Sequence, residues 1–237
     1  ATPCAIQEDN FTGHLGRRDS GFRNVQDHFY SNPGGHAVVW AEENSRDAIF
    51  SAIRRKETYA TSGTRPVLRF FGGSQLDDNA CSDPQGITKA YARGVPMGGN
   101  LGSVETALKF FVSAQKDPGI ASNPGTDLQR IQIIKGWVDA SGQSHEQVVD
   151  VAGDADNGAG VDPNNCQRLG RGESQLCAVW QDPDFDPAVP AFYYARVIEN
   201  PTCRWSTWQC QAGGVNPFAA DCADQAEQAN QEAADRL

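Results

Sequence analysis

The sequence predicts an α+β protein in which one strand–helix unit precedes a mainly antiparallel, β-sandwich-like part. Two observations predict this class. Residues 37–56 pass from a short apolar run to apolar positions at helical spacing. From residue 65 onward, six or seven β-rich runs follow with no strong helical pattern between them.

The strand–helix unit begins after a breaker cluster, Asn-Pro-Gly-Gly, at residues 32–35. The apolar run 37–40 is typical of a buried strand. Asn44 is the expected N-cap of the next helix, whose apolar positions 48, 49, 52 and 53 share one face. Glu42 and Glu43 lie at the C-terminal end of the strand, where α/β proteins bind ligands. The alternative is that both acids only favour the helix N-terminus.

The β-rich part is predicted from runs of β-branched and aromatic residues. Residues 139–142 are expected to form the turn of a hairpin between two of these runs. The expected strands are 67–71, 108–112, 131–138, 146–151, 177–180 and 192–198.

The cysteines suggest disulfides. Cys203 and Cys210 flank six residues and Cys166 and Cys177 flank ten, so we expect one short disulfide loop within each pair. A metal site is the alternative, but neither spacing is Cys-x2-Cys and no histidine is near. Disulfides predict a periplasmic or secreted protein. The three remaining cysteines, at least one of which has no partner in this chain, are Cys4, Cys81 and Cys222.

Composition excludes several classes of protein. Hydrophobic residues make up 39% and charged residues 21% of the 237 residues, as in ordinary globular proteins. The net charge of −10 argues against nucleic acids and anionic membrane surfaces as partners. No apolar stretch approaches the roughly 20 residues that a membrane span requires.

Two acidic loops invite a calcium-site interpretation. Residues 153–162 (GDADNGAGVD) lack the third ligand and the closing glutamate of an EF-hand. Residues 182–187 (DPDFDP) alternate aspartate with other residues, but their prolines suggest a rigid turn. Both loops are therefore expected to be solvated connectors.

Residues 34–73, GGHAVVWAEENSRDAIFSAIRRKETYATSGTRPVLRFFGG, resemble the late part of a large bacterial family filed as domain of unknown function 3604. Members of that family resemble PHP-type metallohydrolases, the relatives of polymerase-associated and histidinol phosphatase domains. The resemblance continues through YARGVPMGGNL (91–101), LQRIQIIKGWVD (128–139), LCAVWQDPDFDP (176–187), FYYARVIENPTCRWSTWQC (192–210) and ATPCAIQEDNFTGHLG (1–16).

The resemblance implies a division into three parts. Residues 1–64 would be the terminal part of a PHP-like β/α barrel, whose last strand–helix unit is the one at 37–56. Residues 65–215 would be a β-rich C-terminal domain. Residues 216–237 would be a polar tail that forms a weak helix or stays frayed.

The resemblance also supplies candidate site residues, although it assigns no catalytic residue. Residues 7–14 would follow the family's last metal-binding Asp-x-His motif. A carboxylate at 42 or 43 would orient a metal-bound water or hold a metal-binding histidine, and Arg65 would face an anionic substrate. The pocket-lining candidates are Glu8, Asp9, Asn10, His14, Glu42, Glu43 and Arg65.

The family's other metal ligands, a His-x-His among them, would lie upstream of Ala1. This chain has no His-x-His and no Asp-x-His, and its four histidines do not stand at metal-ligand spacing. We therefore expect the C-terminal piece of a longer hydrolase. The parent would use a divalent metal of the zinc or manganese class, and the isolated piece would hold no complete metal site and be inactive.

The predicted function is that of a metal-dependent hydrolase acting on a small-molecule ester or phosphoester. The alternative is a non-catalytic β-sandwich module that binds a ligand or partner in an exported protein. An enzyme with a serine or cysteine nucleophile is a third class, but the chain has no Gly-x-Ser-x-Gly and no evident Cys–His pairing.

Overall fold

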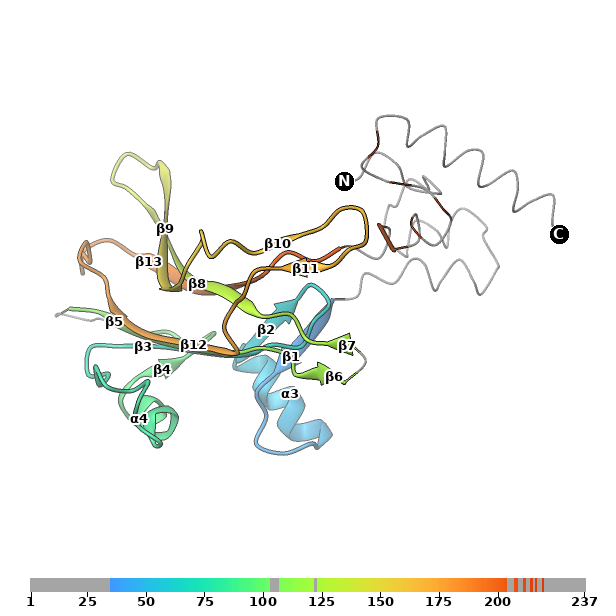
Figure 1. The fold of residues 1–237 in the computed structure, drawn as a ribbon. Coiled ribbons are helices and arrows are strands. Elements are labelled where there is room, and N and C mark those ends of the chain that lie inside the picture. The colour runs from blue at the N-terminus through green and yellow to red at the C-terminus, as the bar shows by residue number, and fades with distance from the viewer. Residues whose placement is uncertain are drawn as a thin grey trace, which may run out of the picture. The chain divides into compact units, whose positions relative to one another are not determined.

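The computed structural model describes residues 35–102, 107–121 and 123–203, together with 207–208, 211, 214, 216 and 219 (Figure 1). The chain forms two compact units. The larger unit comprises residues 34–157 and 171–200, and the smaller unit contains residues 158–170 and the described residues beyond 200. The tail predicted at 216–237 and the segment 1–34 lie outside the described residues, apart from 216 and 219.

The larger unit holds both described helices and all but two of the described strands. Its helices are α3 (Arg46–Arg54) and α4 (Gly86–Arg93). Its strands are β1 (His36–Val39), β2 (Thr58–Thr61), β3 (Val67–Gly73), β4 (Val95–Pro96), β5 (Lys109–Gln115), β6 (Gly119–Ile120), β7 (Asn123–Pro124), β8 (Leu128–Val138), β9 (Ser144–Gly153), β12 (Gln175–Gln181) and β13 (Ala191–Glu199). The smaller unit contains the hairpin of β10 (Gly160–Val161) and β11 (Arg168–Leu169).

The sheets are antiparallel, as the sequence predicts. One sheet has the order β12-β5-β3-β4 and a second has the order β13-β8-β9. The expected hairpin is confirmed, because β8 and β9 pair across a turn in which Asp139 accepts from the backbone of Ser141 and Gln143. All six expected strands are present. Five of the expected ranges lie inside a described strand, and the sixth, 108–112, begins one residue before β5.

The main core lies between the two larger sheets, because inward-facing residues alternate along their strands. Leu68 and Phe70 of β3 and Phe110 of β5 face the three-stranded sheet, and Phe71 and Phe111 face the other way. That second face of the four-stranded sheet packs against α4, as Figure 1 shows. The buried residues of the main core are Leu68, Phe70, Leu108, Phe110, Val112, Ala114, Leu128, Ile131, Ile133 and Leu176.

The predicted strand–helix unit is present as β1 followed by α3, but its strand is exposed or half-buried and not buried as expected. Its cap was predicted wrongly: the N-cap is Ser45, whose Oγ accepts from Ala48 N at 3.3 Å, and not Asn44. A shift of one residue in the helix boundary changes which side chain caps the first turn. Sequence spacing places that boundary only to within one or two residues. β1 pairs antiparallel with β2 in a two-stranded sheet.

Helix α4 corrects the expectation that no helix separates the strands. Ala90 is buried against Phe71 and Phe111, while Ile87 and Tyr91 of the same helix remain partly exposed. The helix has only eight residues and its N-cap, Gln85, makes no side-chain capping bond. Such a short helix depends on packing against the sheet, which local sequence does not display.

The disulfide pairing was also predicted wrongly. Cys81 is bonded to Cys177, 96 residues away, and Cys166 to Cys203, 37 residues away. Cys177 points to the α4 side of β12, where the turn bearing Cys81 lies, so sheet packing decides its partner. Cys210 lies outside the described residues.

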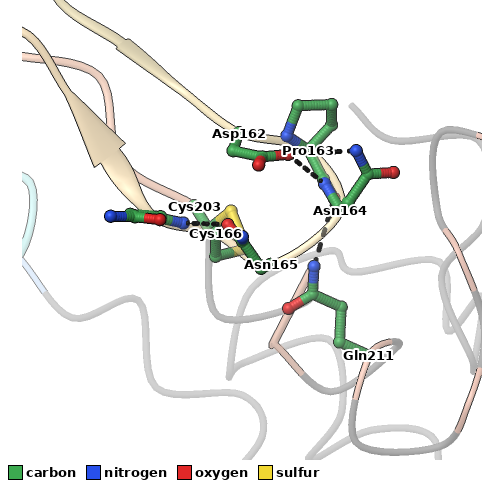
Figure 2. Close-up of a disulfide and its surroundings, with 8 residues drawn as sticks. Asp162, Pro163, Asn164, Asn165, Cys166, Cys203 and Gln211 are labelled. Atoms are coloured by element: carbon green, nitrogen blue, oxygen red, sulfur yellow. Dashed lines mark hydrogen bonds between the residues drawn. A yellow bond between two sulfur atoms is a disulfide. The ribbon is translucent and has the colours of Figure 1, made fainter.

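The Cys166–Cys203 disulfide lies within the smaller unit (Figure 2). Cys166 ends the loop between β10 and β11, and its backbone N donates to Asp162 O at 2.8 Å. Gln211 Nε2 donates to Pro163 O of the same loop at 3.1 Å. The bond therefore joins the hairpin loop to the chain after residue 200.

No described helix has the length and apolarity needed to cross a membrane. Residues 36–64 belong to the same compact unit as the two larger sheets. The division expected at residues 64 and 215 stays a prediction.

Candidate functional site

The larger unit contains a cavity of about 810 Å³. A volume of this size fits a small organic ligand. Its walls come from β2, β3, the start of β5, residues 95–102, residues 185–190 and the first half of β13. These segments are far apart in the sequence and meet only because the two larger sheets pack together.

The inner wall of the cavity is apolar and aromatic. Phe70 and Phe110 stack with ring centroids 5.5 Å apart, and Tyr193 lies 4.3 Å from Phe110. Their neighbours Leu68 and Leu108 are buried. The remaining aromatic and proline residues of the wall are Tyr59, Pro96, Phe185, Pro187, Pro190, Phe192 and Tyr194.

Glycine shapes one side of the cavity. A Cβ added to Gly72 would meet the Phe110 ring at 3.0 Å and Leu101 Cδ1 at 3.1 Å. Gly72 therefore leaves room for those side chains on the cavity side of β3. Gly98, with φ of 81°, is the other essential glycine, because a Cβ there would collide with the carbonyl oxygen of Lys56.

The cavity wall also carries polar groups. Asn100 uses its Oδ1 to accept from Gly102 N at 2.9 Å, and Tyr59 donates its hydroxyl proton to Pro66 O at 2.9 Å. Among the described lining residues, Lys56 is the one cation and Asp186 the one carboxylate.

A second cavity of about 440 Å³ shares lining residues with the first. The shared residues are Asp186, Val189, Ala191 and Tyr193. The loop 183–190 and the start of β13 therefore line both cavities.

A buried ion pair anchors this loop. Lys135 Nζ lies 2.7 Å from Asp182 Oδ2 and donates to Asp184 O at 2.8 Å. Tyr193 donates to the same Asp182 oxygen at 2.6 Å, and Asp184 N donates to the other oxygen at 2.9 Å. The expectation of a solvated connector at 182–187 is thus wrong for Asp182, whose carboxylate is fully buried.

The pKa values reflect this network. Burial by itself raises the pKa of Asp182. Hydrogen bonds from Lys135, Tyr193 and Asp184 lower it by more than burial raises it, so the net shift is downward. Burial, and then the hydrogen bond to Asp182, raise the pKa of the Tyr193 hydroxyl. Asp182 is therefore held as the carboxylate and Tyr193 as the neutral phenol.

A second network lies next to Lys56 in the chain, although none of its residues lines the cavity. Glu57 is buried next to Lys56 and accepts from the Tyr91 hydroxyl. Arg69 donates to that hydroxyl at 2.7 Å and lies 3.9 Å from Glu57. The Arg69 guanidinium also lies 3.2 Å from the centroid of the Trp40 ring. Burial, and then the bond to Glu57, raise the pKa of Tyr91.

The predicted site residues are not brought together in the described structure. Glu42 and Glu43 are exposed in the loop between β1 and α3, and neither lines a cavity. Arg65 is exposed, lines neither cavity, and uses its backbone N to bond Asp117. The remaining candidates, Glu8, Asp9, Asn10 and His14, lie outside the described residues.

Sequence reasoning missed Lys56, Asp186 and the Lys135–Asp182 pair. One signal was available for the pair: Lys135 interrupts the apolar strand IQIIKGWV, and a buried lysine requires a carboxylate partner. No comparable signal marks Lys56, because it follows two arginines at the end of a helix.

The described residues contain no group of three or more His, Cys, Asp or Glu side chains placed to hold a metal ion. Asp154 in the loop at 153–162 instead accepts from Asp156 N at 2.8 Å within a turn. What the described arrangement can do chemically is hold a ligand with an apolar body against an aromatic wall.

The model of a family described as "Protein of unknown function (DUF3604)" matches residues 1–234. No curated protein and no solved structure matches the chain.

Proposed function

Because the chain belongs to the DUF3604 family of proteins of unknown function, we propose a function from its described geometry: it binds a small organic ligand in the 810 Å³ cavity. The single observation that carries this proposal is the cavity itself. Its inner wall is aromatic and aliphatic, and its lining also includes the polar residues Lys56, Asn100 and Asp186; ligand pockets commonly combine such an apolar wall with polar groups that orient the ligand.

The neutral dye N-phenyl-1-naphthylamine tests this proposal, because its fluorescence rises in an apolar site. We expect saturable binding to the full chain. Thr58→Trp, which places an indole at the cavity wall, should weaken binding at least about tenfold by filling the space. Ala60→Trp is the matched control, because Ala60 is exposed on the same strand and lines neither cavity. Equal dye affinity in both variants, with unchanged circular dichroism, would reject the cavity as a site.

We also propose that this chain is the C-terminal part of a longer protein. We propose that its ligand is an ester or phosphoester substrate and that the parent is a PHP-like metal-dependent hydrolase, with residues 1–64 completing a barrel. Support comes from the match to DUF3604 and from the long strings at 1–16, 34–73 and 91–101 that resemble it. Members of DUF3604 resemble PHP-type metallohydrolases.

The described residues do not offer a donor set for a divalent metal of the zinc or manganese class, so no chemical step is assigned to one. Elemental analysis of the longer protein, with hydrolysis of 4-nitrophenyl phosphate and 4-nitrophenyl acetate, tests the proposal. Stoichiometric metal together with metal-dependent turnover is expected. Absence of both from a folded, full-length parent would leave the alternative of a non-catalytic binding module.

We also propose a periplasmic or secreted location, supported by two disulfides, which persist in oxidising compartments. Fractionation of the native host, followed by thiol labelling of the recovered protein, tests it. Recovery from the cytoplasm with reactive thiols at Cys81 and Cys177 would contradict the proposal.

A further inference from the structure

Lys56 is the one described cation that lines the larger cavity, and no described carboxylate pairs with it. Asp186, the lining carboxylate, belongs to the loop 183–190 and has its Oδ1 occupied by Ala188 N at 2.8 Å. The cavity wall therefore includes one exposed lysine whose ammonium pairs with no described carboxylate.

The backbone of Lys56 is in the left-handed region, with φ of 60°. It closes helix α3 in a Schellman arrangement: Lys56 N donates to Ile53 O at 2.9 Å and Glu57 N donates to Ala52 O at 3.2 Å. Glycine is the usual residue at this position, because it adopts positive φ without strain. A lysine here is strained, and the cap does not need its side chain.

The complementary charge at the helix C-terminus does not explain Lys56 either, because Arg54 and Arg55 already supply it. Strain of this kind is a reason to look for a role of the side chain. Gly98 packs directly against Lys56 O, so the loop 97–102 holds Lys56 at the cavity wall.

We propose that Lys56 recognises an anionic head group and that the ligand has an apolar or aromatic body carrying a carboxylate, sulfate or phosphate. The apolar body would lie against the wall that Phe70, Phe110 and Tyr193 form, and the head group would pair with the Lys56 ammonium. This inference rests on the proposed binding function of the cavity.

Two dyes with the same aromatic skeleton separate the head group from the body. One is 8-anilinonaphthalene-1-sulfonate, and the other is N-phenyl-1-naphthylamine, which lacks the sulfonate. Lys56→Gly should lower the affinity for the sulfonate about five- to tenfold, which is the scale of one partly exposed, charge-assisted hydrogen bond. The same variant should leave the affinity for the neutral dye within about twofold.

Lys56→Gly should also raise the melting temperature, by about 2–4 °C, because it relieves the strain at φ of 60°. A gain in stability combined with a selective loss of anion affinity is a result that a merely structural lysine would not produce. Lys56→Arg should retain most of the sulfonate affinity. Arg65→Met is the matched control: it removes one exposed cation outside both cavities and should change neither affinity.

The carboxylate in the cavity wall provides an independent test. Asp186→Asn keeps an oxygen for Ala188 N but removes one negative charge. It should strengthen binding of the sulfonate about twofold and leave the neutral dye unchanged.

The inference is overturned if Lys56→Gly weakens both dyes equally or neither, while Thr58→Trp still weakens the neutral dye. In that case the cavity remains a binding site without an anion preference. If Thr58→Trp leaves the neutral dye unaffected, the binding function fails, and the inference about Lys56 fails with it.

Discussion

Lys135 Nζ lies 2.7 Å from Asp182 Oδ2, and the two side chains are only 9% and 0% exposed. The pair joins β8 to the loop 183–190, which lines both cavities. A buried charge pair contributes little net stability, but removing one partner leaves the other uncompensated.

Lys135→Met should therefore lower the free energy of unfolding by about 3–5 kcal/mol, measured by urea denaturation. Lys109→Met is the control, because the partner of Lys109, Asp78, is 82% exposed, and its loss should cost no more than about 1 kcal/mol. Lys135→Met combined with Asp182→Leu should recover much of the lost stability. Similar costs for the two single variants would mean that the Lys135 pair is effectively solvated.

The pH dependence of stability should report Asp182. Its pKa in the folded protein is lowered, because hydrogen bonds to the carboxylate outweigh the opposing effect of burial. The group therefore stabilises the fold above its unfolded pKa of about 4, and this contribution is lost as pH falls through the lower folded value.

The difference in unfolding free energy between wild type and Asp182→Asn should accordingly be largest near pH 7 and shrink below about pH 4. Urea titrations at several pH values measure it. Glu42→Gln is the control, because Glu42 is exposed and makes no described contact that neutralisation would break. A wild-type advantage that grows as pH falls would contradict the lowered pKa.

Peptide mapping without reduction should recover two cross-links, Cys81 to Cys177 and Cys166 to Cys203. Replacing Cys81 and Cys177 with alanine should cost roughly 2–5 kcal/mol, because the bond closes a loop of 96 residues. Peptides that join Cys166 to Cys177 would instead restore the pairing expected from local spacing.

Ser45→Ala should destabilise the protein by about 1 kcal/mol, because it removes the acceptor for Ala48 N at the start of α3. Asn44→Ala should change stability by less than about 0.5 kcal/mol, because Asn44 is exposed and does not cap the helix. Thermal unfolding of both variants compares the two positions. A larger loss of stability for Asn44→Ala would mean that Asn44, and not Ser45, caps the helix.

Tyr91→Phe should cost about 1–3 kcal/mol, because Glu57 is buried and loses a hydroxyl donor. Tyr194→Phe is a suitable control, because Tyr194 is exposed and its hydroxyl makes no hydrogen bond to the described residues. A neutral result at both positions would show that Arg55 and Arg69, which lie 3.5 Å and 3.9 Å from Glu57, are enough to satisfy its carboxylate.

Much of the fold is predictable because its strands and turns follow from residue patterns within short segments of the sequence. The β-branched and aromatic runs of β3, β5, β8 and β13 and the polar turn at Asp139 are visible in the sequence, and the structure has them. Helix α4 is not, because its eight residues gain stability from packing against Phe71 and Phe111.

The candidate site is less predictable than the fold. Lys56, Phe110 and Tyr193 come from three separate segments and line one cavity only after two sheets pack together. The candidates that resemblance supplied within the described residues, Glu42, Glu43 and Arg65, lie outside both cavities.

By itself, the sequence determined the mainly antiparallel class, the β1–α3 unit and family membership, because periodicity and long shared strings are properties of local segments. Only the tertiary structure decided the partners of Cys81 and Cys166, the burial of Asp182 and the place of Lys56 at a cavity. Each of these depends on residues far apart in the chain, and packing of the sheets alone brings such residues within contact distance.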